Sequence, residues 1–118
     1  MDVVTAAQAR ELALTLPEAF EQDHHGRPSF RVAGRIFATL WTERVMNVMA
    51  GEERIRAAAE ERRDVCREIF WGARLSAVQV DLEHAVPELL EDLLEFAWRA
   101  KASARVLQRR DALTSGGG

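Results

Sequence analysis

Three runs of strand-forming residues follow one another between positions 29 and 50 with only short breaks, and this succession constrains the fold most. Residues 29–32 alternate polar and apolar side chains, which is typical of a strand. Residues 35–41 are rich in β-branched and aromatic side chains, and residues 45–50 are almost entirely apolar. The breaks at 33–34 and 42–44 are short enough to be tight turns. Because strands joined this directly pair antiparallel, we expect an antiparallel sheet.

The register of the first hairpin stays open from the sequence. Depending on whether the loop has an even or an odd number of residues, Phe37 or Ile36 shares a face with Phe30. Both faces of 35–41 are largely apolar, so this run is predicted to be a central strand. Residues 18–28 are polar and contain a glycine and a proline, which predicts a loop.

Helices are predicted at both ends of the chain. Residues 5–16 place small and apolar side chains at helical spacing, with Thr5 as the N-cap and Pro17 as the stop. The last helix begins at Pro87, where the missing N–H of proline costs nothing. Its apolar stripe, predicted to be buried, consists of Leu90, Leu93, Leu94, Ala97 and Trp98.

The segment between the third strand and the last helix contains both helical and strand-like spacing of apolar residues. Residues 51–63 predict a short charged helix, residues 65–70 a short strand or an extended segment, and residues 75–82 a further strand. We therefore predict an α+β fold with a single antiparallel sheet of four or five strands, covered on one face by the N- and C-terminal helices. One domain is expected over residues 1–110, followed by a disordered tail over residues 111–118.

Length, hydropathy and cysteine content limit the classes of protein to which this chain can belong. A chain of 118 residues with 47% hydrophobic content can build one core. No apolar run approaches the roughly 20 residues of a membrane-spanning helix, and the N-terminus lacks a signal-type pattern. The one cysteine, Cys66, excludes an internal disulfide and fits a reducing compartment. We expect a cytoplasmic protein without a membrane partner.

Arginine marks two candidate contact regions for nucleic acid. Residues 24–41 hold no acidic residue but carry Arg27, Arg31 and Arg35. A second group crowds the C-terminal end: Arg99, Lys101, Arg105, Arg109 and Arg110. Such side chains can contact phosphates, or they can solvate a strand face and complement a helix C-terminus. The net charge of −3 argues mildly against a dedicated nucleic-acid binder.

Other reactive residues carry weaker signals. His24 and His25 have no cysteine or acid at zinc-ligand spacing, so we expect loop histidines. The acidic patch on the last helix suits a hard cation or, as we favour, a solvated face: Glu88, Glu91, Asp92 and Glu95. Cys66 is expected to be inert, although its neighbour Arg67 would lower the pKa of the thiol. No catalytic motif is present, so we predict no enzyme, no catalytic residue, no cofactor and no metal.

The aromatic residues are expected to be structural. Alternating arginine and aromatic side chains, as in Phe30-Arg31, are a weak signal for nucleic-acid binding. We expect packing in the core or at its rim, rather than base stacking, for Trp41, Trp71 and Trp98.

The order and spacing of several short motifs resemble the MmcQ/YjbR family. They are Leu-Pro at 16–17, HGRPSF at 25–30, GRIFA at 34–38, Trp-Gly at 71–72 with VDL at 80–82, and the closing helix from 88 to 98. The resemblance covers residues 5–107 and implies a CyaY- and frataxin-like α+β fold. It also implies DNA binding, the label commonly given to members. Many relatives carry Lys where this chain has Asn47, and Trp near its Ser76-Ala77.

Two functions are compatible with these observations. The first is non-specific DNA binding through phosphate contacts from Arg27, Arg31, Arg35, Arg99, Lys101 and Arg105. It requires the two groups to share one face, and it predicts strong salt dependence. The second is a non-enzymatic module that binds a protein or a small ligand on the open sheet face or in a cleft beside Trp71, with little salt dependence. The acidic charge balance favours the second; we take the first as the working hypothesis because the family label supports it and it names its residues.

Overall fold

A six-stranded antiparallel sheet forms the centre of the computed structural model, which describes the backbone of residues 4–116 and the side chains of residues 4–112. Its spatial order is β1-β2-β3-β4-β6-β5. The strands are β1 (Phe20–His24), β2 (Arg27–Val32), β3 (Arg35–Thr42), β4 (Val45–Val48), β5 (Cys66–Trp71) and β6 (Arg74–Asp81). The helices are α1 (Ala6–Leu14), α2 (Glu52–Glu61), α3 (Pro87–Lys101) and α4 (Ala104–Gly116).

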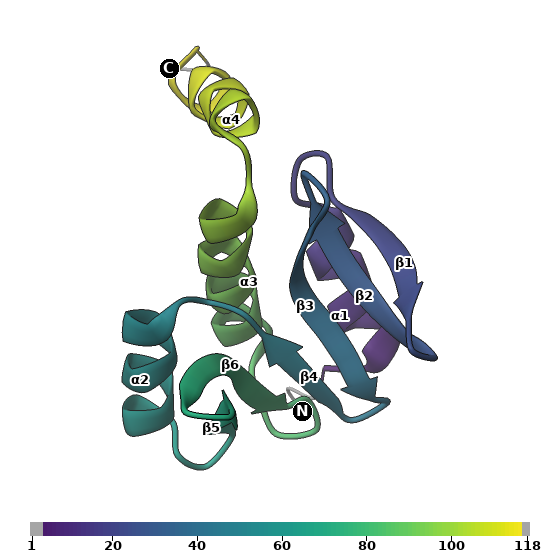
Figure 1. Ribbon diagram of the computed structural model, residues 1–118, viewed down its shortest axis with the longest axis vertical. Coiled ribbons are helices and arrows are strands. Elements are labelled where there is room, and N and C mark those ends of the chain that lie inside the picture. The colour runs from purple at the N-terminus through teal and green to yellow at the C-terminus, as the bar shows by residue number, and fades with distance from the viewer. Residues whose placement is uncertain (1–3, 117–118) are drawn as a thin grey trace.

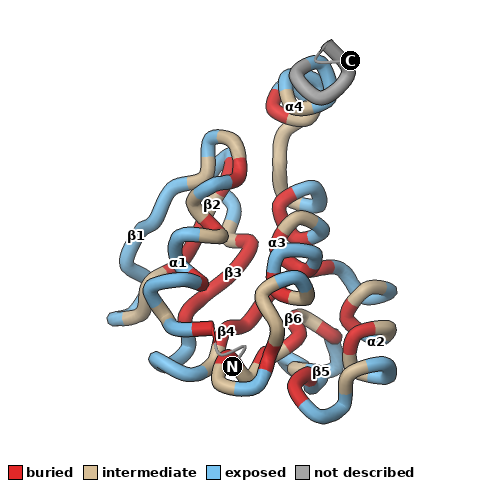
Figure 2. The backbone as a smooth tube through the Cα atoms, turned by 180° about the vertical axis from the view of Figure 1, so that it is seen from behind, coloured by how far each residue is buried: buried red, intermediate tan, exposed pale blue. Residues whose placement is uncertain are grey.

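The predicted α+β class with one antiparallel sheet is confirmed. Helix α1 lies behind β2 and β3 in Figure 1 and in front of them in the reverse view of Figure 2, and α3 packs against α1 and β3. Helix α2 packs on β5 and β6. These elements share one core, in which Phe30, Phe37 and Trp98 are fully buried. The opposite face of the sheet, turned toward the viewer in Figure 1, is called the open face below.

The sheet has six strands, whereas we predicted four or five, because residues 20–24 form β1 where a loop was expected. All five residues of β1 are exposed, so burial leaves no alternating pattern in its sequence, FEQDH. The strand exists because its backbone pairs with β2, from Phe20 opposite Arg31 to His24 opposite Arg27. This edge strand is held in the sheet by backbone hydrogen bonds to its one neighbour, β2.

A β-bulge between Phe30 and Arg31 settles the register of the β2–β3 hairpin. Phe30 pairs with Ala38 and Arg31 pairs with Ile36, so Phe37 is the extra residue on β3. The bulge lets Phe37 and Ala38 both be buried in the core with Phe30, while Ile36 points to the open face. The tight turn predicted at residues 33–34 is present, and both Ala33 and Gly34 have positive φ.

The C-terminal region is two helices rather than the one that the sequence suggested. Helix α3 begins at Pro87 as predicted and ends at Lys101, where Ala102 is extended. Ser103 then starts α4, because its hydroxyl accepts a hydrogen bond from the Val106 N–H at 3.3 Å. Of the tail predicted over 111–118, residues up to Gly116 lie in α4, and residues 117–118 lie outside the described range.

The N-terminal helix carries the expected cap. The Thr5 hydroxyl accepts from the Gln8 N–H at 3.1 Å, and the Gln8 side chain accepts from the Thr5 N–H at 2.9 Å. Across the described residues, no helix is both long and apolar enough to cross a membrane.

Candidate ligand-binding cleft on the open face of the sheet

The antiparallel register aligns a row of polar residues across the whole open face. Residues that pair directly across neighbouring strands point to the same side of a sheet. From one edge to the other, the row consists of Gln22, Ser29, Thr39, Asn47, Gln79 and Arg67. Ser29, Thr39 and Asn47 are the buried members, with 0%, 6% and 4% of their surface exposed. Something other than a helix therefore covers the middle of this face.

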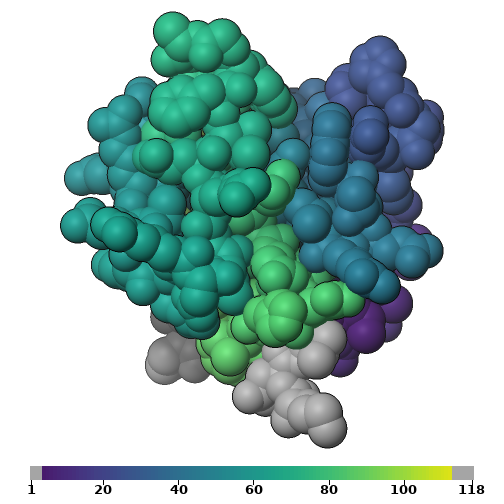
Figure 3. All heavy atoms as spheres, turned by 90° about the horizontal axis from the view of Figure 1, so that it is seen from below, coloured from purple at the N-terminus to yellow at the C-terminus, as the bar shows by residue number. Residues whose placement is uncertain are grey.

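The side chains that surround the middle of this face form the walls of a cleft of about 410 Å³. Figure 3 shows the surface hollowed between the teal-green atoms of the β5–β6 region and the blue-purple atoms of β1 and β2. Apolar residues that line it are Ile36, Trp41, Met49 and Trp71; polar residues at its floor are Thr39 and Asn47; and basic residues at its rim are His24, His25, Arg27 and Lys101. These ten residues define the open-face cleft.

The floor of the cleft presents polar atoms that the protein does not satisfy. The Gln79 side-chain amide donates to Asn47 Oδ1 at 3.4 Å. Within the described part of the chain, the Asn47 amide nitrogen and the Thr39 hydroxyl have no hydrogen-bond partner. Neither atom is sealed from solvent, since buried side-chain atoms without partners are absent among these residues. Both groups are therefore available to a molecule in the cleft.

Two tryptophans line the cleft while remaining largely exposed. Trp41 keeps 44% and Trp71 keeps 57% of its surface accessible. Large aromatic surfaces that stay accessible beside a cleft mark interaction sites more often than packing. Trp98, by contrast, is completely buried in the core, so the three tryptophans divide between the core and its rim.

The rim of the cleft is basic. The guanidinium carbon of Arg27 lies 3.7 Å from the centroid of the Trp41 ring, and Arg27 Nε donates to the Trp41 carbonyl at 3.0 Å. The two-residue turn between β1 and β2 uses positive φ at His25 and Gly26, which places His25 beside His24 with ring centroids 4.4 Å apart. No carboxylate lines the cleft within the described residues.

The cations that we predicted from the hairpin divide between two places. Arg27 is part of the rim, and Arg31 lies next to it, donating to the Ser29 hydroxyl at 3.1 Å and lying 3.5 Å from His24 Nδ1. Arg35 lies at the other end of β2, opposite Val32, and does not line the cleft. Among the described residues none of these three arginines forms an ion pair with a carboxylate.

The C-terminal cations are mostly occupied by acidic neighbours. Arg99 binds Glu95 at 2.9 Å and approaches Asp111 at 3.5 Å. Arg105 lies 3.7 Å from Glu18, which also binds Arg109. Lys101 differs, because it lines the open-face cleft and has no ion-pair partner within the described range. Of the two predicted basic groups, Arg27 and Lys101 line the same cleft, and Arg31 lies next to its rim residue His24.

Several cleft residues were not predicted from the sequence. Thr39 and Asn47 belong to strands that read as apolar, and their shared position became visible only through the pairing of β3 with β4. Ile36 and Met49 were expected to be ordinary strand residues. The sequence signal was a polar residue at the same relative position of consecutive strands, which cannot be aligned until the register is known.

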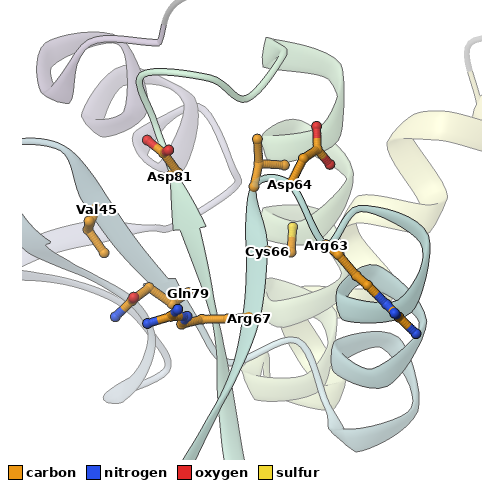
Figure 4. A pocket seen from close by; sticks show the side chains of 8 residues that line it. Val45, Arg63, Asp64, Cys66, Arg67, Gln79 and Asp81 are labelled. Atoms are coloured by element: carbon orange, nitrogen blue, oxygen red, sulfur yellow. The ribbon is translucent and has the colours of Figure 1, made fainter.

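A second cavity, of about 290 Å³, lies beside Cys66 and is lined by Asp64, Arg67 and Asp81 among others (Figure 4). Burial raises the pKa of the Cys66 thiol, and the arginines that oppose this shift are Arg62 and Arg54 rather than the predicted Arg67. A thiol with a raised pKa is a poor nucleophile. This cavity therefore offers no activated cysteine.

Two of the four residues of the predicted acidic patch, Asp92 and Glu95, form ion pairs. On α3, Asp92 binds Arg54 at 2.5 Å, and Glu95 binds Arg99 and Arg110, each at 2.9 Å. Asp81, Glu83 and His84 lie together, with ligand atoms within 4.8 Å of one another. There, His84 Nδ1 contacts Asp81 at 2.8 Å and Glu83 binds Arg44 at 3.0 Å. All of these groups have protein partners.

Comparison with known proteins agrees with this architecture. The model of the YjbR family matches residues 14–100. A crystal structure of the Deinococcus radiodurans protein DR2400, which contains the DUF419 domain, superposes with a TM-score of 0.67 at 19% sequence identity, over 83% of this chain and 78% of that one. No curated protein matches. Because the family model covers most of the chain, the protein belongs to the YjbR family.

Proposed function

We propose that this chain is a non-enzymatic binding module whose ligand site is the open-face cleft. The observation that carries the proposal is the pair of exposed tryptophans, Trp41 and Trp71, beside two almost fully buried polar side chains, Thr39 and Asn47. Clefts of about 300–1,000 Å³ with apolar walls and a few convergent polar groups are the usual form of small-ligand sites.

The absence of a linked nucleophile and base supports binding rather than catalysis. Thr39 supplies a hydroxyl to the cleft, and His24 and His25 supply titratable nitrogens. In the described part of the chain, no hydrogen bond joins Thr39 to either histidine. A hydroxyl needs such a base within hydrogen-bond reach to act as a nucleophile.

The test uses anilinonaphthalene sulfonate, an anionic aromatic dye whose fluorescence rises in apolar sites. We expect saturable binding that is weakened at least about fivefold by Trp71→Ala, since an aromatic wall contact of this kind is worth on the order of 1 kcal/mol or more. Phe70→Ala is the matched control, because Phe70 is similarly exposed at 51% but does not line the cleft. Equal effects of the two substitutions would contradict the proposal.

DNA binding through the same face is the second candidate, favoured by the convergence of Arg27, Arg31 and Lys101 without carboxylate partners among the described residues. Arg99 and Arg105 support it less, because Glu95, Asp111 and Glu18 neutralise them. A nucleic acid would then lie across the β1–β2 turn and the end of α3, with its phosphates on these three cations.

Fluorescence anisotropy of a labelled duplex and of a labelled single strand tests this candidate. Three phosphate contacts predict a loss of roughly tenfold to fiftyfold in affinity between about 50 and 200 mM salt. Replacing Arg27 and Arg31 by Ala is expected to abolish binding, whereas replacing Arg99 and Arg105 by Ala is expected to change it little. No binding of either DNA at the lower salt concentration excludes the candidate.

A further inference from the structure

The walls of the open-face cleft suit a planar ring. Trp41 and Trp71 both keep about half of their surface exposed and come from different parts of the sheet, at the end of β3 and the end of β5. Met49, which lines the same space, adds a polarisable thioether. An indole face stacks on any nucleobase, because every base has a π-face, and stacking of this kind is sequence-tolerant.

The floor of the cleft suits the edge of a heterocycle. Asn47 offers an amide N–H donor, and Thr39 offers a hydroxyl that donates or accepts. Neither group has another partner for these functions in the described residues. A purely hydrocarbon ligand would leave both groups unsatisfied on a floor that it desolvates, which is costly. The floor therefore selects a ring whose edge carries hydrogen-bonding atoms.

The rim of the cleft suits an anion. Arg27 and Lys101 reach it from opposite parts of the molecule, from the start of β2 and the end of α3, and His24 and His25 border it. The guanidinium of Arg27 is held in place by Trp41, which leaves it pre-oriented for a phosphate. This charge is local, since the whole chain has a net charge of −3.

We infer that the ligand of the open-face cleft is a nucleotide unit. Its base lies against Trp41 and Trp71, the edge of the base meets Asn47 and Thr39, and its phosphate lies at Arg27 and Lys101. The inference rests on the proposed function, namely that this cleft is a ligand site, and it adds the chemical class. The same unit occurs free as a mononucleotide and as an unpaired nucleotide within a single strand.

Displacement of the bound dye, together with tryptophan fluorescence, tests the inference on the full chain. Adenosine monophosphate is expected to displace the dye and to quench tryptophan emission, and adenosine and ribose phosphate are each expected to bind at least about tenfold more weakly because each lacks one contact. Arg27→Gln is expected to reduce the preference for the monophosphate over adenosine by about tenfold. Arg35→Gln is the matched control, since Arg35 lies on the neighbouring strand outside the cleft.

The outcomes separate the two proposals. Dye binding that depends on Trp71 but is not displaced by any mononucleotide or hexanucleotide overturns the nucleotide inference and leaves the ligand site intact. Absence of both dye and nucleotide binding overturns both. Nucleotide binding that Asn47→Leu and Arg27→Gln leave unchanged also overturns the inference, because it places the nucleotide elsewhere. If a single-stranded hexanucleotide binds at least tenfold more tightly than the monophosphate, the nucleotide that the cleft binds belongs to a single strand rather than to a free mononucleotide.

Discussion

The guanidinium of Arg27 stacks on the indole of Trp41, with 3.7 Å between the Arg27 Cζ atom and the ring centroid, and its Nε–H bonds the carbonyl of the same tryptophan. Arg27 is the first residue of β2 and Trp41 is the last but one of β3, so this side chain joins the two strands beyond their last backbone pair, Ser29 with Thr39. The contact also fixes the orientation of two residues of the open-face cleft, the Trp41 ring in its wall and the Arg27 guanidinium at its rim.

Arg27→Lys is expected to lose this stack while keeping the charge. A lysine has no planar group to lie on the ring, and exposed cation–π contacts contribute about 0.5–1 kcal/mol. We expect a loss of about that size in the free energy of unfolding, measured by urea denaturation. Arg35→Lys is the control, because Arg35 has no side-chain partner within the described residues and its replacement is expected to change stability by less than about 0.5 kcal/mol.

Trp98 and Trp71 are expected to respond in opposite ways to removal of the indole. Trp98 is completely buried, and its Nε1–H bonds the carbonyl of Pro17 at 2.9 Å, which ties α3 to the end of α1. Trp98→Ala therefore leaves a cavity and an unsatisfied carbonyl, and about 3–5 kcal/mol of stability is expected to be lost. Trp71→Ala is expected to cost less than about 1 kcal/mol in the same denaturation experiment. A similar loss in both variants would contradict the burial of Trp98.

Cys66 is expected to react slowly with alkylating reagents. Burial raises the pKa of its thiol above the ordinary value of 9.0, so the folded state disfavours the thiolate that reacts. The free energy of unfolding is therefore unaffected by this thiol below its ordinary pKa. It decreases as pH rises from there through the higher folded pKa, because the thiol of the unfolded chain ionises first. At pH 8 the rate with iodoacetamide is expected to be at least about tenfold below that of the urea-unfolded chain, which provides the control.

His84 is expected to titrate above its ordinary pKa. Its hydrogen bond to the Asp81 carboxylate, at 2.8 Å, favours the imidazolium form and raises the pKa of His84 above 6.5. The stability that this pair contributes is therefore fully present below pH 6.5 and is lost as pH rises through the folded pKa. NMR titration of the imidazole protons measures the shift. Asp81→Asn is expected to return the pKa toward its ordinary value, and an unchanged pKa in that variant would contradict the pairing.

The sequence determined the local elements wherever a side-chain pattern accompanied burial. The alternation at Phe30 and Val32, the glycine turn after them and the apolar stripe of α3 predicted elements that the structure confirms. Strand β1 was not predicted, because all of its residues are exposed and leave no alternating pattern in the sequence. Its pairing depends on backbone hydrogen bonds to β2. The end of α3 at Lys101 was not predicted either, because the segment around Ser103, which caps the next helix, has an otherwise helical composition.

Tertiary structure alone decided where the candidate site lies. The sequence named Arg27, Arg31 and Lys101 but grouped them with Arg35, Arg99 and Arg105, because charge runs show which cations are near in the chain and not which carboxylates face them in space. Thr39 and Asn47 became the floor of a cleft only when pairing of β3 with β4 set them side by side. Side-chain patterns encode local periodicity, whereas a binding site depends on the register and curvature that join distant strands.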